Sequence, residues 1–276
     1  MKIGIRAHDF GKQSVETLPK NIKQAGFDCV QLAPVKAIEG VNSFADINKA
    51  LLEKIRINYE KNKVDITVLG CYIEPSIFDK EQRLANVAIF QDNLSHAKEL
   101  GVKIVGTETT RMHPDTPEQE REKAYELLKD SVLRMAQTAE KHEVNIGIEP
   151  VADHTLNTPQ LTKRLIEDIN SKWLKIIFDP FNMLLPRTAH KQEEIYKEMF
   201  DLFGDKIVVL HVKDTIIQQN EKTWANIGRG IINYQYIMQH LPSVNMLRED
   251  IKLESYEQDR EAMKKILAYH GNGIKD

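Results

Sequence analysis

The chain has little of what marks several classes of protein. Its 276 residues include only two cysteines, Cys29 and Cys71, which are too few for a disulfide framework and lack metal-ligand spacing. Glycine and proline number 13 and 10, and no tract is of low complexity, so disorder is not expected. The longest apolar runs have the length of strands, far below the roughly 20 residues of a membrane span. The first residues also lack the apolar core of a secretory signal. We therefore expect a cytoplasmic globular protein with no membrane partner.

The charge balance excludes a further class. There are 38 basic and 41 acidic residues, which give a formal net charge of −3. A strongly basic nucleic-acid-binding protein would carry the opposite excess, because it must neutralise backbone phosphates. We expect no nucleic-acid partner.

Short β-rich runs alternate with longer amphipathic stretches along the chain. Successive runs end about 35 residues apart, close to the length of one β-strand plus helix unit. The expected strands are Ile3–Arg6, Cys29–Ala33, Ile66–Tyr72, Lys103–Thr107, Asn145–Glu149, Lys175–Asp179, Ile207–His211 and Ile251–Glu254. Eight such units predict an α/β fold, a (β/α)8 TIM barrel that occupies residues 1–276 as a single domain.

A doubly wound sheet is the alternative to the barrel. It predicts a glycine-rich turn after the first strand, but residues 6–11 read Arg-Ala-His-Asp-Phe-Gly and contain no G-x-G-x-x-G. Helix starts are marked by Asp79 with Gln82 three residues on, by Thr116-Pro117, and by Thr158-Pro159.

Charged or imidazole groups end each of the last four expected strands. These residues are Glu149, Asp179, His211 and Glu254. In a TIM barrel the carboxyl ends of the strands form the functional face, so the four side chains should converge. Three carboxylates brought together out of water would repel one another, and a divalent cation would neutralise them. The sequence therefore predicts one metal site. Its mixed oxygen and nitrogen donors suit Mn²⁺, Mg²⁺, Co²⁺ or Zn²⁺ and do not distinguish among them; our expectation is Mn²⁺.

Five motifs resemble those of the xylose isomerase-like TIM barrels, the family of sugar phosphate isomerases and epimerases, ketose 3-epimerases and inosose dehydratases. They are Ile-Glu-Pro at 148–150, Asp-Pro-Phe-Asn at 179–182, His-Val-Lys-Asp at 211–214, Ile-Gly-Arg-Gly-Ile-Ile at 227–232 and Leu-Glu-Ser at 253–255. The resemblance extends from Ile3 to about Leu267. It implies that Glu149, Asp179, His211 and Glu254 hold the metal, and that Glu149 and Glu254 are also the catalytic acid and base.

The resemblance implies a reaction as well. One glutamate would remove the proton next to the carbonyl of a sugar or sugar phosphate, giving a metal-stabilised enediolate, and the other would return a proton. The alternative is a lyase of the inosose dehydratase type, which expels water instead of reprotonating. Many epimerases of the family have a histidine three residues after the sixth-strand aspartate, where this chain has Asn182. Asparagine carries no proton, which puts a strict ketose 3-epimerase in doubt.

Further residues are candidates for contact with the substrate, a small sugar or polyol. Lys213 lies two residues after His211 and should point the same way if the strand continues. Arg229, between Gly228 and Gly230, follows the seventh strand, where barrels often bind phosphate. The candidates are His8, Glu108, Asn182, Lys213 and Arg229.

Two more remote alternatives remain. An apurinic endonuclease of similar fold should have additional histidines, but Asn182 stands at one of those positions, and no histidine lies two residues after an aspartate in the seventh loop. A non-catalytic barrel would have no physical reason to keep the three costly carboxylates. The resemblance also implies a dimer or tetramer. The sequence does not identify the sugar or its phosphorylation state.

Overall fold

Eight parallel strands close into a barrel in the computed structural model, which describes residues 1–113, 115–249 and 253–270. The order around the barrel is β1, β10, β7, β6, β5, β4, β3, β2, and β2 closes on β1. The strands are β1 (Ile3–Arg6), β2 (Cys29–Leu32), β3 (Asp65–Gly70), β4 (Ile104–Glu108), β5 (Asn145–Glu149), β6 (Leu174–Phe178), β7 (Ile207–Val212) and β10 (Asn245–Arg248). The predicted (β/α)8 TIM barrel is confirmed.

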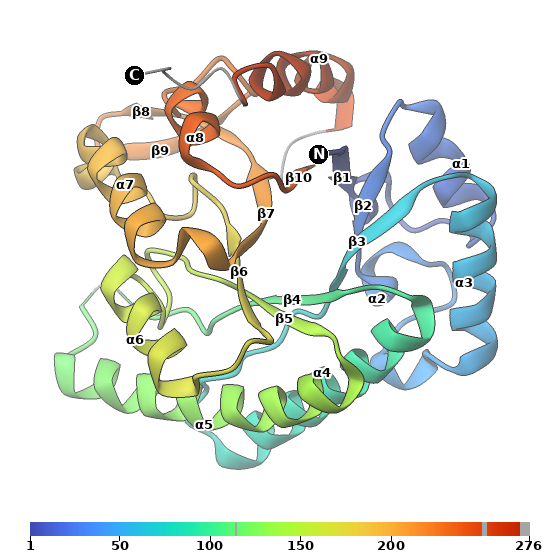
Figure 1. The fold of residues 1–276 in the computed structure, drawn as a ribbon, viewed down its shortest axis with the longest axis horizontal. Helices are drawn as coiled ribbons and strands as arrows, with labels where there is room; N and C mark the ends of the chain where they lie inside the picture. The colour runs from blue at the N-terminus through green and yellow to red at the C-terminus, as the bar shows by residue number, and fades with distance from the viewer. Residues whose placement is uncertain (114, 250–252, 271–276) are drawn as a thin grey trace.

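Helices surround the barrel on its outer side, as Figure 1 shows. They are α1 (Thr17–Gln24), α2 (Pro34–Ala37), α3 (Lys49–Lys61), α4 (Lys80–Leu100), α5 (Glu118–His142), α6 (Pro159–Ile169), α7 (Gln192–Phe203), α8 (Tyr234–His240) and α9 (Tyr256–Leu267). Short 3₁₀ helices are η1 (Ala7–Phe10), η2 (Phe44–Asp46), η3 (Pro186–Lys191), η4 (Gly204–Lys206) and η5 (Leu253–Ser255). None of the described helices combines the length and apolar character that crossing a membrane requires.

Two of the three helix starts marked in the sequence are confirmed. The Asp79 carboxylate accepts a hydrogen bond from the Gln82 backbone N–H at the start of α4, and the Thr158 hydroxyl accepts one from the Leu161 N–H at the start of α6. The Thr116 cap is wrong, because α5 begins one residue later, with Pro117 in the capping position and no side-chain cap.

The predicted eighth strand is wrong. The barrel is closed by β10 (Asn245–Arg248), which pairs with β7 and with β1. Of the expected strand Ile251–Glu254, residues 251 and 252 lie outside the described part of the chain, and Leu253 and Glu254 belong to the helix η5. Local sequence favoured the later run, but the unpaired edges of β1 and β7 must be covered, and residues 245–248 cover them.

A hairpin that the sequence analysis did not predict follows β7. It consists of β8 (Asp214–Gln218) and β9 (Glu221–Ala225), which pair antiparallel. Its turn places Gln219 and Asn220 in the left-handed region, at φ 50° and 63°. This hairpin lies between the seventh strand and the helix that follows, so it extends the loop face of the barrel.

Six buried side chains from six strands fill the barrel as a cluster separate from the larger core around it. They are Cys29, Val68, Ile104, Ile177, Val209 and Leu247. Glycines make room for them: a Cβ added at Gly106 would lie 2.7 Å from Val68 Cγ1, and one at Gly147 would lie 2.9 Å from Ile104 Cγ2. The filled interior is the floor on which the loop face rests.

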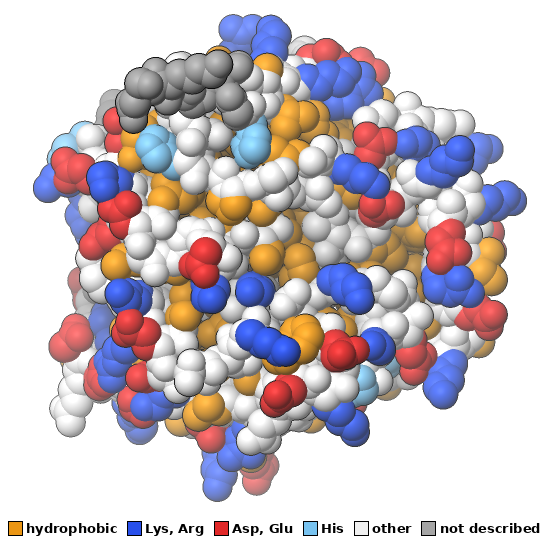
Figure 2. All heavy atoms as spheres, in the orientation of Figure 1, with side chains coloured by type: hydrophobic (Ala, Val, Ile, Leu, Met, Phe, Trp, Pro, Cys, Tyr) orange, Lys and Arg blue, Asp and Glu red, His pale blue; other side chains and the backbone are white. Residues whose placement is uncertain are grey.

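Charges of both signs cover the outside. Figure 2 shows Lys and Arg interspersed with Asp and Glu around the periphery of one face, and hydrophobic side chains toward its middle. This mixture accords with the small formal net charge of −3.

The packing of the barrel floor leads to a prediction about its glycines. We expect Gly106→Ala to lower the free energy of unfolding by about 1–3 kcal/mol, because the new methyl group overpacks Val68 and Ile177. Chemical denaturation measures this. The matched control is Gly204→Ala, whose Cβ would make ordinary contact at 3.8 Å with Phe200 and whose backbone φ of −55° suits alanine. An equal loss of stability in both variants would contradict the packing argument.

Candidate metal centre and active site

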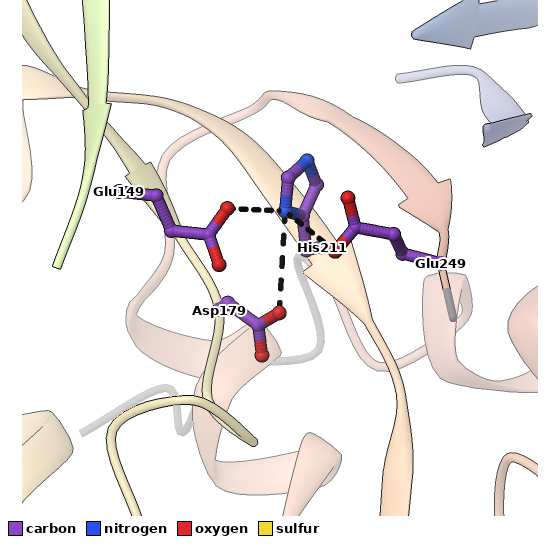
Figure 3. Close-up of side chains that lie close together, drawn as sticks. All are labelled: Glu149, Asp179, His211 and Glu249. Atoms are coloured by element: carbon purple, nitrogen blue, oxygen red, sulfur yellow. Dashed lines mark ion pairs between the residues drawn. The ribbon is translucent and has the colours of Figure 1, made fainter. Parts of the chain in front are cut away.

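Four polar side chains meet at the carboxyl ends of four neighbouring strands. Glu149 is the last residue of β5, Asp179 directly follows β6, His211 lies in β7, and Glu249 directly follows β10. All four are buried, with at most 3% of each residue exposed. Figure 3 shows the three carboxylates arranged around the His211 ring, with Glu149 and Glu249 on opposite sides. Side chains far apart in the sequence are thus brought to one point by strand order alone.

The donor atoms lie within reach of one ion. His211 Nδ1 is 3.0 Å from Glu149 Oε2, 3.4 Å from Glu249 Oε2 and 4.0 Å from Asp179 Oδ2. One donor atom from each of the four residues lies within 4.8 Å of every other. These spacings let four donors share one divalent cation after small side-chain movements.

The hydrogen bonding of these atoms also fits a cation. Three of the donors, Asp179 Oδ2, His211 Nδ1 and Glu249 Oε2, are buried and form no hydrogen bond of normal geometry; their close contacts are ion pairs with one another and with Lys213. Buried polar atoms are rarely left so, because desolvation costs free energy. All three face the same point, and oxygen and imidazole nitrogen are ligands that Mn²⁺, Mg²⁺ and Zn²⁺ accept. The residues present therefore fit a divalent metal ion.

The imidazole of His211 is held in the orientation that metal binding requires. His211 Nε2 lies 3.1 Å from the amide oxygen of Gln31. An amide oxygen only accepts, so Nε2 donates, and in the neutral ring Nδ1 keeps its lone pair toward the carboxylates. Gln31 is fixed in turn, because its amide nitrogen donates to the Tyr72 hydroxyl at 2.9 Å.

Lys213 supplies a cation inside the carboxylate group. Only 1% of this residue is exposed, and its Nζ lies 2.7 Å from Asp179 Oδ2 and 2.9 Å from Glu249 Oε2. It follows His211 by two positions, and both side chains reach the same group, as the strand periodicity predicts. The structure thus places the predicted substrate-binding residue Lys213 directly against two of the carboxylates.

The mutual charges shift the titration of the group. Burial lowers the pKa of His211, but the charges of Glu249 and Glu149 outweigh it and raise the pKa to about 9. Burial raises the pKa of Asp179 to about 6, although Lys213 opposes the rise. Burial also tends to raise the pKa of Glu249, but His211 and Lys213 prevail, and that pKa is lowered.

Asn182 braces two members of the group. Its side-chain nitrogen donates to Glu149 Oε1 at 2.5 Å, and its backbone N–H donates to Asp179 Oδ1 at 3.0 Å. This leaves Glu149 Oε2 to face His211. The structure therefore puts the predicted residue Asn182 in the site, where it orients the Glu149 carboxylate.

The structure does not bring Glu254 into the group. Glu254 is exposed in η5, after the end of the barrel, and the fourth position belongs to Glu249. The sequence analysis missed Glu249 because it follows Arg248 and precedes Asp250, a run that looks like a solvated charged loop. The signal that could have found it is its place directly after the short run Asn245–Arg248.

Two further predicted substrate-binding residues, Glu108 and His8, lie at the same end of the barrel. Glu108 ends β4 and pairs in register with Glu149 of β5. Its Oε2 lies 3.9 Å from His154 Nε2, and burial, with the charges of Glu149 and Glu249, raises its pKa to about 8. His8 lies in η1, edge-on to the Tyr72 ring at 6.0 Å.

Arg229 lies apart from the group. Its side chain is exposed, and the backbone N–H groups on either side of it already bind a carboxylate of the same chain, that of Asp214. The Gly228 and Gly230 N–H groups each donate to Asp214 Oδ2 at 2.9 Å, and the Ile232 N–H donates to Asp214 Oδ1 at 3.2 Å. This nest of amides has the form of a phosphate site, but an internal carboxylate occupies it.

The hairpin adds an aromatic wall beside Lys213. Trp224 of β9 stacks on Phe181 with ring centroids 4.3 Å apart, and Lys213 Nζ lies 5.5 Å and 5.8 Å from the Phe181 and Trp224 ring centroids. Lys222 Nζ fixes this side by donating to the backbone carbonyls of Phe181 and Leu184. Neither the hairpin nor its aromatic pair was predicted.

Comparison with known proteins agrees with this architecture. No curated protein matches the chain significantly. Among solved structures, a D-tagatose 3-epimerase-like protein has a TM-score of 0.76 and 21% identity, with 97% of each chain covered. D-psicose 3-epimerase, solved in the presence of D-fructose, has a TM-score of 0.75 and 17% identity over 97% of this chain and 99% of that chain. The IolI protein with a bound zinc atom has a TM-score of 0.74 and 17% identity over 100% of both chains.

These identities are low, so the solved structures establish the shared fold. A family model is more specific, and it matches residues 19–269. With that match and the eight-stranded barrel, this chain belongs to the xylose isomerase-like TIM barrel family.

Proposed function

We propose that the protein is a divalent-metal-dependent isomerase or epimerase of a small sugar. The observation that carries the proposal is the convergence of Glu149, Asp179, His211 and Glu249 at the loop face of the barrel. The solved structures of D-tagatose 3-epimerase-like and D-psicose 3-epimerase proteins with the same fold support it. When bound, the cation would supply Lewis-acid stabilisation of negative charge on the substrate oxygens.

The two glutamates are the proposed acid and base, with Glu249 in the role that the sequence analysis gave to Glu254. Glu149 and Glu249 come from strands that are separated by β6 and β7 and lie on opposite sides of His211. A sugar bound between them would present opposite faces to the two carboxylates. One glutamate would take the proton next to the carbonyl at a carboxylate oxygen, and the other would return a proton.

Neighbouring residues would orient the substrate. Glu108, whose pKa burial raises to about 8 in the metal-free protein, lies beside Glu149 and would hydrogen-bond a sugar hydroxyl. Asn182 would hold Glu149 in place, and Lys213 would stabilise negative charge near Asp179. His8 would cover the substrate from the side of β1.

We propose an unphosphorylated substrate. The Gly228–Gly230 amides, which the sequence analysis offered to a phosphate together with Arg229, bind Asp214 instead. We also propose that Mn²⁺ is the preferred ion and that the chain acts as one domain. A dehydratase remains the second candidate, since the same carboxylates would begin water loss by the same proton abstraction.

The reaction type is tested by a screen of free and phosphorylated ketoses with Mn²⁺ in deuterium oxide. We expect a free ketose to change one stereocentre or its carbonyl position and to take up deuterium at the carbon next to the carbonyl, because that proton passes through a carboxylate. Mass spectrometry and NMR measure both changes. Loss of one water from the product would instead assign the dehydratase, and preference for phosphorylated sugars would contradict the proposed substrate.

The identity of the fourth donor is tested by a matched pair, Glu249→Gln and Glu254→Gln. We expect Glu249→Gln to lose measurable metal binding at micromolar Mn²⁺ and to lower kcat by about 10²–10⁴, because it removes both a donor and a proton carrier. Glu254→Gln should behave as wild type, because that side chain is exposed outside the group. Atomic absorption after dialysis and steady-state kinetics give the readouts. A defect in Glu254→Gln with an unaffected Glu249→Gln would refute the assignment.

Metal binding should release a proton. At pH 8 the metal-free protein keeps His211 protonated, since its pKa is raised to about 9, whereas a ligating imidazole is neutral at Nδ1. We expect about one proton released per Mn²⁺ at pH 8, and affinity that weakens as pH falls. Titration calorimetry in buffers of different ionisation enthalpy measures the proton count. Binding with no proton released at pH 8 would contradict the role of His211.

A further inference from the structure

A network of largely buried ion pairs lies beside Glu249. Arg6 ends β1, the barrel neighbour of β10, and its Nη1 lies 4.0 Å from Glu249 Oε1. The other side of the same guanidinium is bound by Asp9 of η1, whose Oδ1 accepts from Arg6 Nε at 2.7 Å. Asp9 thus holds the cation that stands beside a proposed metal donor.

Arg248 continues this network of ion pairs on the side away from Glu249. It is the last residue of β10, directly before Glu249, so the two side chains point to opposite faces, and none of Arg248 is exposed. Its Nε donates to Asp259 Oδ2 of α9 at 2.9 Å, and its Nη1 lies 3.6 Å from Asp9 Oδ2. Asp259 is itself fixed, since its Oδ1 accepts from the Ile227 backbone N–H at 3.0 Å.

Asp9 therefore lies between two guanidinium groups, those of Arg6 and Arg248. Its side chain is only 3% exposed, so little water screens these interactions. Were the Asp9 charge removed, Arg6 would lose the carboxylate that draws it to η1. The attraction between Arg6 Nη1 and Glu249 Oε1, which lie 4.0 Å apart, would then act without the opposing pull of Asp9, and it would draw the Glu249 carboxylate away from His211 and Lys213.

We propose that Asp9 is a positioning residue for the metal centre: it restrains Arg6, and so keeps the Glu249 carboxylate available to a divalent cation. The inference rests on the proposed function, because it takes Glu249 to be a metal donor. Arg248 sets the geometry by tying the end of β10 to both Asp9 and α9. In metalloproteins, residues that contact a ligating carboxylate without touching the metal commonly orient it in this way.

The competing explanation is that Asp9 acts only through its negative charge. A carboxylate near a cation site raises affinity by simple attraction, whatever Arg6 does. The two explanations differ in how Asp9 and Arg6 depend on each other. Pure charge gives independent effects of the two residues, whereas restraint of Arg6 gives an Asp9 effect that disappears when Arg6 is gone.

The test is a double-mutant cycle of Asp9→Asn and Arg6→Gln, with the Mn²⁺ and Zn²⁺ dissociation constants measured by calorimetry at pH 8. We expect Asp9→Asn to weaken binding by about 10–100-fold, the usual effect of losing an outer-shell partner. In the Arg6→Gln background the same change should have an effect of less than about threefold. Equal effects of Asp9→Asn in both backgrounds would overturn the proposal, and so would wild-type affinity in the single variant.

Two controls distinguish loss of the positioning role from misfolding of a variant and from the absence of a metal site. Asp65→Asn removes a carboxylate that pairs with Lys2 at the opposite end of the barrel, and it should leave metal affinity unchanged. Thermal unfolding of the metal-free variants shows whether Asp9→Asn is folded, and an unfolded single variant that Arg6→Gln does not rescue would count against the proposal. Failure of the wild-type protein to bind either metal would refute the metal centre itself, whereas wild-type binding with no coupling would refute the positioning role alone.

Discussion

Three carboxylates buried within reach of one imidazole are the constraint around which the loop face of this barrel is organised. Isolated from water, Glu149, Asp179 and Glu249 would repel one another and resist ionisation. Lys213 and the raised pKa of His211 offset part of this charge within the protein. Lys213 and protonated His211 leave one net negative charge on these three carboxylates, with Arg6 at the edge of the group 4.0 Å from Glu249. A divalent ion that displaced the His211 proton would neutralise that charge.

Residues around the three carboxylates and His211 hold this group in position. Gln31 sets the tautomer of His211, and Asn182 sets the rotation of Glu149. Asp214 fills the amide nest of the Gly228–Gly230 loop and so fixes the hairpin that carries Trp224. Each of these contacts pairs a polar group within the protein. Fewer polar groups of the loop face therefore remain to bind a substrate.

The sequence predicted the first seven strands to within one or two residues, because each is a short β-rich run between longer amphipathic stretches. Three of the four donors followed from the ends of those runs. The eighth strand failed because Asn245–Arg248 is short and ends in charge, whereas residues 251–254 alternate in a way that looks like a strand. Only closure of the barrel, a contact with β1 some 240 residues away, selects the earlier run. Gln31 escaped notice for a similar reason: its role depends on β7, which lies far along the chain.

The position of Arg248 shows why local pattern could not reveal Glu249. An arginine next to a glutamate and an aspartate is ordinarily a solvated run, and the residue types alone give no reason to bury it. Here the guanidinium is fully buried because α9 returns Asp259 to it, while η1 brings Asp9 to the other side. Burying Arg248 on one face of the strand end fixes Glu249 on the other, since successive side chains alternate. The place of Glu249 in the group is therefore specified by partners of Arg248 at residues 9 and 259, and it becomes visible only when the chain is folded.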